Sequence, residues 1–279
     1  NNLVLKGDGT LPQISVPSNG GTMAELIEVD GANNATIEAL DLDGNTAGID
    51  GIVTENDVDS GLTIADNTID GVDGDHVIDA GVSGTVLEGD LTITNNTLGS
   101  NNDVDPAVTV NGENINVSEN VINQVNGEGI NVADVTGSSL TLGNNSITFA
   151  GSNNGINIVA TSGDPSISIT ADSQNPASIG QIGGTTGSDA VEIAGITTTG
   201  DLTIDGLKVA NVDQGIDVSQ SDTISGDVVF TNLNLTKAGQ SQSAIEYSFS
   251  SGTSPGTVAI NNSLIDNANT GPAIDLTAD

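Results

Sequence analysis

The stretch LTIADNTI at residues 62–69 combines a short alternating strand, a polar turn and the beginning of a second strand. Close variants follow along the chain: LTITNNTL at residues 91–98, INVSENVI at 115–122 and LTLGNNSI at 140–147. Repeats with periods of about 20 to 50 residues indicate solenoids and arrays. The phrase therefore marks a structural unit that the chain uses many times.

An apolar anchor at the centre of the strand recurs through the whole chain. The anchors are Ile37, Ile64, Ile93, Val117, Leu142, Ile169, Ile204, Phe230 and Ile260. Consecutive anchors are separated by 24 residues (Ile93 to Val117) to 35 residues (Ile169 to Ile204). A strand at residues 26–29 is expected to supply one more unit before Ile37. The sequence thus predicts about ten coils.

Each unit also carries a second short strand with an apolar-polar-apolar pattern, which places two side chains inward and one outward. Examples are residues 78–80, 108–110, 130–132, 156–158, 191–193, 216–218, 245–247 and 274–276. Apolar residues do not recur at helical spacing, and β-branched residues dominate the strands. A single coil cannot bury these side chains, whereas stacked coils form a continuous core.

Asparagine stands three positions after the anchor in four successive units, at Asn67, Asn96, Asn120 and Asn145. Stacked asparagines at a tight turn can hydrogen-bond along the stack and satisfy backbone groups. With the repeated phrase, they make the chain resemble the right-handed parallel β-helices of the pectate-lyase-like superfamily. We expect one all-β domain over residues 1–279, built as a β-solenoid and belonging to a longer secreted protein.

The charge of the chain restricts its partners. Among 279 residues, 38 are Asp or Glu and three are Lys, there is no Arg, and the formal net charge is −35. Nucleic acids and anionic membranes would be repelled. Cysteine is absent, and no apolar run approaches the roughly 20 residues of a membrane span. We therefore expect no nucleic-acid partner and no direct membrane insertion of this segment.

Catalytic signatures of the resembled enzymes are missing. Those enzymes use an Arg or Lys base, or clustered Asp with His and Arg, whereas Arg is absent here and Lys6, Lys208 and Lys237 are far apart in sequence. Pairs of carboxylates for glycoside hydrolysis are easily found by chance among 38 acids. We therefore predict no enzyme and no catalytic residue, and interpret His76 as a solvated loop residue.

Two glycine-containing segments carry oxygen ligands of the kind that Ca²⁺ takes in groups of about six to eight. The candidate metal ligands are Asp41, Asp43, Asn45, Asp70, Asp73 and Asp75. The alternative is that these residues are solvated acids of turns. No cofactor is required by the predicted fold, so calcium is an optional ligand.

The outward position of the second strand is acidic in the last four units, at Glu192, Asp217, Glu246 and Asp275. In a parallel, in-register stack these carboxylates would be about 4.8 Å apart and would repel one another. We predict an acidic column whose repulsion is relieved by cations or by salt.

The outward position of the first strand carries a hydroxyl-rich column of Thr36, Thr63, Thr92, Asn116, Thr141, Ser168 and Thr203. Regular threonine ladders on flat β-solenoids can bind ice. The companion column is irregular, and β-propensity alone also explains the threonines.

The chain is similar to the passenger regions of bacterial autotransporter and inverse-autotransporter (invasin-like) adhesins. The resemblance implies a rigid stalk at the bacterial cell surface that presents a surface for adhesion. Its partners would be a receptor or glycan on a host or neighbouring cell and the adjacent domains of its own chain. The alternatives are a polysaccharide-active enzyme or carbohydrate-binding module on the same fold, and an ice-binding solenoid.

Overall fold

A computed structural model of the chain places most of the 279 residues. The described residues are 2–7, 13–15, 24–31, 33–44, 48–55, 60–81, 87–100, 106–150, 153–171, 178–182, 188–219, 223–238, 242–249, 255–267 and 272–278. None of them belongs to a helix, so this part of the chain contains no helix that is long and apolar enough to cross a membrane.

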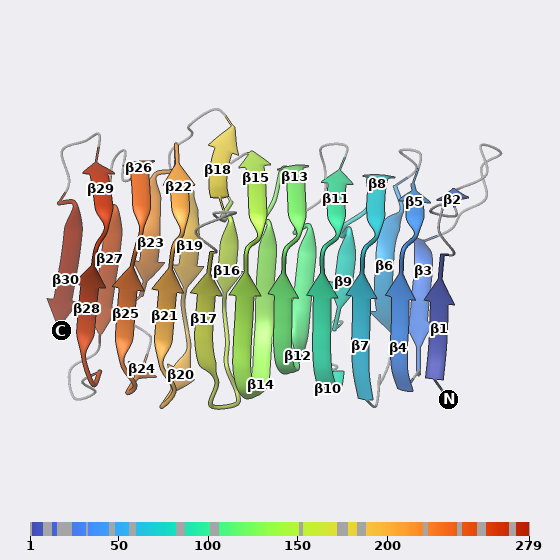
Figure 1. The fold of residues 1–279 in the computed structure, drawn as a ribbon, viewed down its shortest axis with the longest axis horizontal. Coiled ribbons are helices and arrows are strands. Elements are labelled where there is room, and N and C mark those ends of the chain that lie inside the picture. The colour runs from blue at the N-terminus through green and yellow to red at the C-terminus, as the bar shows by residue number, and fades with distance from the viewer. Residues whose placement is uncertain are drawn as a thin grey trace.

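The strands form three faces that run along the molecule, with all pairings parallel (Figure 1). The first face contains the predicted anchors. Its strands are β1 (Asn2–Lys6), β4 (Asn33–Glu38), β7 (Ser60–Ala65), β10 (Leu87–Thr94), β12 (Val108–Ser118), β14 (Ile130–Gly143), β17 (Ser166–Thr170), β21 (Leu202–Asp205), β25 (Val228–Thr231) and β28 (Val258–Asn261).

The second face is a ten-stranded sheet that follows the polar turn of each unit. Its strands are β2 (Gln13–Ser15), β5 (Asp41–Asp43), β8 (Thr68–Val72), β11 (Thr97–Ser100), β13 (Val121–Val125), β15 (Ser146–Ala150), β18 (Ser178–Ile182), β22 (Lys208–Ala210), β26 (Asn234–Ala238) and β29 (Leu264–Asn267).

The third face carries the second strands that the sequence predicts. It contains β3 (Glu25–Asp30), β6 (Asp50–Glu55), β9 (Ile78–Ala80), the beginnings of β12 and β14, β16 (Ile156–Ile158), β19 (Asp189–Ile193), β23 (Gln214–Val218), β27 (Ile245–Phe249) and β30 (Ile274–Ala278). Because β12 and β14 continue around the bend, the first and third faces form one 18-stranded sheet. A small separate sheet pairs β20 (Thr197–Thr198) with β24 (Thr223–Ile224).

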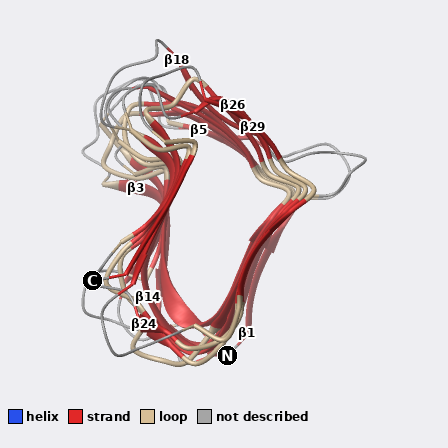
Figure 2. Cartoon of the chain, turned by 90° about the vertical axis from the view of Figure 1, so that its left-hand side faces the viewer, coloured by secondary structure: helices blue, strands red, loops and turns tan. Residues whose placement is uncertain are grey.

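The predicted fold class is confirmed: the chain is all-β, and its parallel faces form a β-solenoid that surrounds one core (Figure 2). The anchors stack in register, as in the pairing of Ile37 with Ile64 and of Ile64 with Ile93. All three side chains are fully buried. Each buried aliphatic side chain contributes roughly 1.5 to 3 kcal/mol, so every added coil extends the same source of stability.

The first unit differs from the expectation. Residues 26–29 do form a strand, but they belong to β3 on the third face, where Ile27 pairs with Ile52. The residue that pairs with Ile37 on the first face is Leu5 of β1. The alternating pattern of residues 26–29 does not distinguish a first-face strand from a third-face strand, because both place alternate side chains inward.

The four asparagines form a buried ladder at the turn between the first and second faces. Asn67 Nδ2 donates to Asn96 Oδ1 at 3.0 Å, Asn96 Nδ2 donates to Asn120 Oδ1 at 3.0 Å, and Asn120 Nδ2 donates to Asn145 Oδ1 at 3.0 Å. The residue before each asparagine has a left-handed φ of 53° to 60°. Asp, Asn and Glu occupy that position, and Asp and Asn tolerate it well. The next equivalent residue, Asp172, lies outside the described residues.

Candidate functional site: an acidic cluster on the third face

The four predicted acids lie in register on successive strands of the third face. Glu192 of β19 pairs with Asp217 of β23, Asp217 with Glu246 of β27, and Glu246 with Asp275 of β30. Their neighbours along the strands point into the core; Val191 and Ile193, for example, are fully buried. Since adjacent strands are about 4.8 Å apart, the acids form one continuous outward column.

Two further acids enlarge the column into a cluster. Asp189 is the first residue of β19, and Asp213 immediately precedes β23. Asp213 is only 3% exposed, and its Oδ2 accepts a hydrogen bond from Gln242 Nε2 at 3.4 Å. The acidic cluster therefore comprises Asp189, Glu192, Asp213, Asp217, Glu246 and Asp275.

Amide side chains hold two of these carboxylates in place. Asn154 Nδ2 donates to Glu192 Oε2, while Asn154 Oδ1 accepts from the backbone N–H of Asp189 at 2.9 Å. Gln214, which is 1% exposed, donates from Nε2 to Glu246 Oε2 at 3.1 Å. Neutral donors stabilise these carboxylates without cancelling their charge, so the cluster remains strongly negative.

Burial and mutual repulsion shift two of the carboxyl groups strongly. Burial, followed by the charges of Asp217 and Glu192, raises the pKa of Asp189 to about 8. Burial and the charges of Glu246 and Glu192 raise the pKa of Asp217 to about 6. The Oδ1 atom of Asp189 is buried and has no hydrogen-bond partner. At neutral pH the Asp189 carboxyl is therefore mostly protonated.

The structure divides the candidate calcium ligands between two places, with Asp41, Asp43 and Asp70 on the second face. Asp43 of β5 pairs with Asp70 of β8 on the second face, and Asp70 Oδ1 accepts a hydrogen bond from Gly71 N at 2.8 Å. Asp41 lies on β5 as well, paired with Thr68.

The other candidate ligands lie elsewhere. Asp73 and Asp75 follow β8 in a turn that is attached to the third face, where Gly74 N donates to Ile49 O at 3.2 Å. Asn45 lies outside the described residues. No group of three or more His, Asp or Glu side chains within the described ranges is arranged to hold a metal ion.

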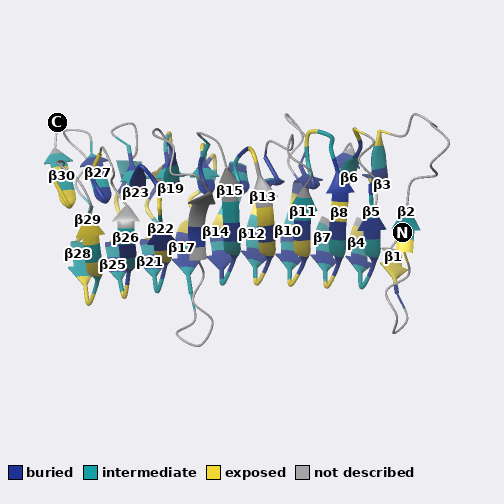
Figure 3. Cartoon of the chain, turned by 90° about the horizontal axis from the view of Figure 1, so that it is seen from above, coloured by how far each residue is buried: buried dark blue, intermediate teal, exposed yellow. Residues whose placement is uncertain are grey.

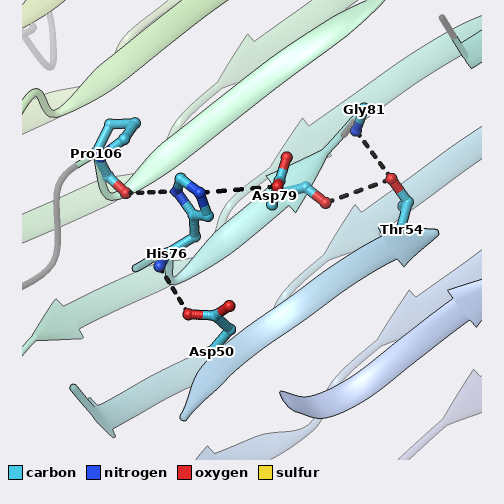
Figure 4. A network of polar contacts seen from close by, with 6 residues as sticks. All are labelled: Asp50, Thr54, His76, Asp79, Gly81 and Pro106. Carbon is cyan, nitrogen blue, oxygen red and sulfur yellow. Dashed lines mark hydrogen bonds and ion pairs between the residues drawn. The ribbon is translucent and has the colours of Figure 1, made fainter. Parts of the chain in front are cut away.

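His76 is not a solvated loop residue: its side chain is 22% exposed and belongs to a polar network (Figure 4). Its Nε2 lies 3.7 Å from Asp79 Oδ2, its Nδ1 lies 3.3 Å from Pro106 O, and its backbone N–H donates to Asp50 Oδ1 at 2.9 Å. Burial raises the pKa of Asp79, although His76 opposes the shift. The network joins β6, β9 and the residues before β12.

The His76 network lies in the same outward column as the acidic cluster, nearer the N-terminus. From Asp79 the in-register column continues through Thr109, Asn131 and Asn157 to Glu192. The column is thus polar along the third face and becomes acidic from β19 onward.

Sequence reasoning found the column but not the whole cluster. Asp189 and Asp213 stand three and four residues before Glu192 and Asp217, and they are not in register, because Asp189 pairs with Gln214. Their burial depends on how the preceding turns pack, which the pattern of the strands does not encode. Comparisons of the chain with known protein families, with curated proteins and with solved structures found no match.

Proposed function

We propose that the chain is a rigid extracellular scaffold of a bacterial surface adhesin. The observation that carries the proposal is the register of the three faces, which holds outward side chains on a fixed lattice along the molecule. A single core extends under that lattice. Such an arrangement is suited to presenting a surface at a distance from its attachment point.

The surface chemistry supports an uncharged or cationic partner. With a formal net charge of −35, the scaffold repels anionic polymers and remains soluble as a separate molecule. Its partner would be a receptor or glycan on a host or neighbouring cell. Other domains of the same chain would connect the scaffold to the cell that makes it.

Adhesion by the purified chain tests the proposal. Beads coated with the chain should be retained on cultured host cells or on neighbouring bacteria, whereas beads coated with polyglutamate at the same charge density should wash off. Protease treatment of intact source bacteria should remove the chain from the cell surface. Equal retention of both kinds of bead, or protection from the protease, would contradict the proposed function.

The acidic cluster favours glycan hydrolysis as a second candidate function. A general acid must hold its proton near neutral pH, and Asp189, with a pKa raised to about 8 beside Glu192 and Asp217, meets that one requirement. Release of reducing ends from neutral glycans, abolished by Asp189→Asn and retained by Asp266→Asn, would support hydrolysis. No release from any glycan would exclude it.

A further inference from the structure

A polar trough crosses the first face, away from the acidic cluster. It consists of two adjoining hollows of about 510 and about 270 Å³. The larger hollow is lined by Asn34, Thr36, Gly61, Thr63, Asp90 and Thr92. The smaller is lined by Asp90, Thr92, Asn114, Asn116, Ser139 and Thr141. Because Asp90 and Thr92 line both, the hollows form one trough across β4, β7, β10, β12 and β14.

Glycine opens the larger hollow. Gly61 has a φ of +49°, and a Cβ atom there would lie 3.2 Å from Asn34 Oδ1 and 3.7 Å from Asp90 O. Gly89 also has a positive φ, of 108°. Both backbone conformations favour glycine. The missing side chains leave room between Asn34 and Asp90, so the face is hollowed here instead of flat.

The lining offers paired donors and acceptors at a regular spacing. Thr36, Thr63, Thr92, Asn116 and Thr141 are in register on successive strands, about 4.8 Å apart. Each threonine hydroxyl can donate and accept. The Oδ1 atom of Asn116, which lines the smaller hollow, is buried and has no hydrogen-bond partner.

One carboxylate and its support complete the lining. Asp90 Oδ1 accepts from Asn114 Nδ2 at 2.9 Å, and Asn114 Oδ1 accepts from Ser138 N at 3.1 Å and from Ser139 Oγ at 3.3 Å. Asn114 therefore supports one oxygen of the exposed Asp90 carboxylate and is itself held by the two serines. No Lys or Arg lines either hollow.

We infer that the trough binds a neutral, extended glycan chain. Sugar hydroxyls need donors and acceptors together, as the threonine and asparagine column provides, and a carboxylate can accept from two neighbouring hydroxyls. The threonine methyl groups supply apolar contacts for the C–H faces of the sugars. The spacing of the strands is close to the length of one sugar in an extended chain, so successive sugars meet equivalent side chains.

Other ligands fit the trough less well. An anionic glycan would meet Asp90 and the net charge of −35 without a cation to bind it. Ice requires a flat face with matched columns, whereas the trough is hollowed and its flanking column reads Ala65, Thr94, Ser118 and Gly143 in register. The inference rests on the proposed function, since it names the surface and the ligand class through which the scaffold adheres.

Titration calorimetry with neutral hexasaccharides of glucose, mannose, galactose and xylose in their common linkages tests the inference. At least one should bind, and hexagalacturonate should not. Thr92→Val, which removes a hydroxyl shared by both hollows, should weaken binding about tenfold, as expected when a hydrogen bond to the ligand is lost. Thr203→Val changes the same column outside both hollows and should bind normally.

The outcomes separate the trough from the proposed function. No binding of any neutral hexasaccharide, equal effects of Thr92→Val and Thr203→Val, or thermal hysteresis without glycan binding would each overturn the inference. Bead adhesion that survives Thr92→Val would place the adhesive surface elsewhere and leave the proposed function standing. Hexasaccharide binding by a chain whose beads do not adhere would support the trough and contradict the adhesin. Unchanged thermal midpoints of both variants establish that they fold.

Discussion

Asn96 of the ladder bonds to the coils on both sides, since its Nδ2 donates to Asn120 Oδ1 of the following coil at 3.0 Å and two further bonds join it to the preceding coil. Asn96 Oδ1 accepts from the backbone N–H of Asn67 at 2.9 Å, and Asn96 Nδ2 donates to Ile64 O at 3.0 Å. Both backbone groups lie where the first face ends and the turn begins, with Ile64 near the end of β7 and Asn67 just before β8. The side chain thus replaces the backbone pairing that is interrupted where one face turns into the next.

We expect Asn96→Ala to lower the free energy of unfolding by about 2 to 6 kcal/mol. It leaves two buried backbone groups without partners, and each costs about 1 to 3 kcal/mol. Asn123→Ala, which removes an exposed asparagine from β13, should change stability by about 0.5 kcal/mol or less. Urea unfolding followed by circular dichroism measures both. Equal effects would mean that the ladder does not stabilise the turn.

Asp189 makes the stability of the chain depend on pH. In the unfolded chain its carboxyl loses its proton near the ordinary pKa of 3.8, whereas in the folded chain it keeps the proton up to about pH 8. The folded state therefore binds more protons in this range, and stability falls as pH rises from about 4 to about 8. The loss is complete above the folded pKa.

Asp189→Asn should therefore stabilise the chain at pH 9 by a few kcal/mol and flatten the decline of stability between pH 5 and 9. Asp266→Asn removes an exposed acid of β29 outside the cluster and tests whether net charge alone explains the gain. Urea unfolding at several pH values measures the difference. If Asp189→Asn leaves the dependence of stability on pH unchanged, the Asp189 carboxyl of the wild-type chain is ionised in the folded state at neutral pH.

For single residues, the sequence identifies those whose position repeats in every unit, and it misses those whose role depends on packing. The ladder asparagines and the acidic column recur at fixed places relative to the anchors, so their alignment follows from parallel register. The six candidate calcium ligands are close in sequence, but strand β8 and the turn after it direct Asp70 and Asp75 to different faces. Proximity in sequence is a poor guide to proximity across a coil.

The turns that join the third and first faces stack glycine on backbone. A Cβ atom at Gly226 would lie 2.3 Å from Gly200 O, and one at Gly200 would lie 2.5 Å from Pro165 O. Atoms of adjacent coils therefore approach too closely for any side chain. The sequence identifies these glycines only as turn residues. In the structure they allow the backbones of adjacent coils to approach closely.

We expect Gly226→Ala to lower the free energy of unfolding by about 1 to 3 kcal/mol, because the contact with Gly200 O forces the turn to shift. Gly112→Ala provides the matched control, since the added Cβ would meet its nearest neighbour, Leu87 Cβ, at 3.6 Å, an ordinary contact. Thermal unfolding compares the two variants. If both are tolerated equally, the turns are able to separate at little cost.

The acidic column should make the elements of the third face sensitive to salt. Asp217 lies between Glu192 and Glu246 in register, and screening weakens their repulsion between about 0.01 M and about 1 M salt. The thermal midpoint should rise with sodium chloride, and less so in Asp217→Asn. Calcium chloride and a chelator, compared at equal ionic strength, distinguish screening from site binding. A thermal midpoint that is unchanged by sodium chloride, calcium chloride and the chelator would contradict the prediction that cations relieve the repulsion within the column.

The sequence predicts the strands of the first and third faces well, because alternation and the repeated phrase mark them. It does not predict that β12 and β14 continue through the bend, as 11 and 14 residues respectively. Nor does it assign residues 26–29 to the third face. Continuity through a bend depends on the hydrogen bonds of both neighbouring coils, which no single unit encodes.

For the molecule as a whole, the repeat predicts a solenoid because stacked coils share one core, and the structure extends that core over the described coils. Stability in such an array depends on contacts between neighbouring coils. The first and last of the described coils each pair with a described coil on one side only. Among the described residues, apolar side chains at the C-terminal end are exposed, with Leu264 at 61% and Leu276 at 51% (Figure 3).

Hydrogen exchange should therefore vary along the molecule. Amides of β12 and β14 are expected to exchange most slowly, because these strands are the longest and have paired coils on both sides. Amides of β28 and β30 should exchange fastest among the strands described, since Leu276 stacks on Tyr247 but has no described strand beyond it. Local opening of few-contact regions costs less free energy than global unfolding.

Asn96→Ala provides the internal test of this gradient. If coils are coupled mainly to their neighbours, the variant should accelerate exchange in β8 and β11 and leave β28 unchanged, because the broken hydrogen bonds join only the adjacent coils. Exchange that accelerates equally in every strand would instead mean that the solenoid opens as one cooperative unit. Mass spectrometry of peptides from the exchanged chain distinguishes the two, and the same experiment shows whether a rigid middle supports the trough on β7, β10 and β12.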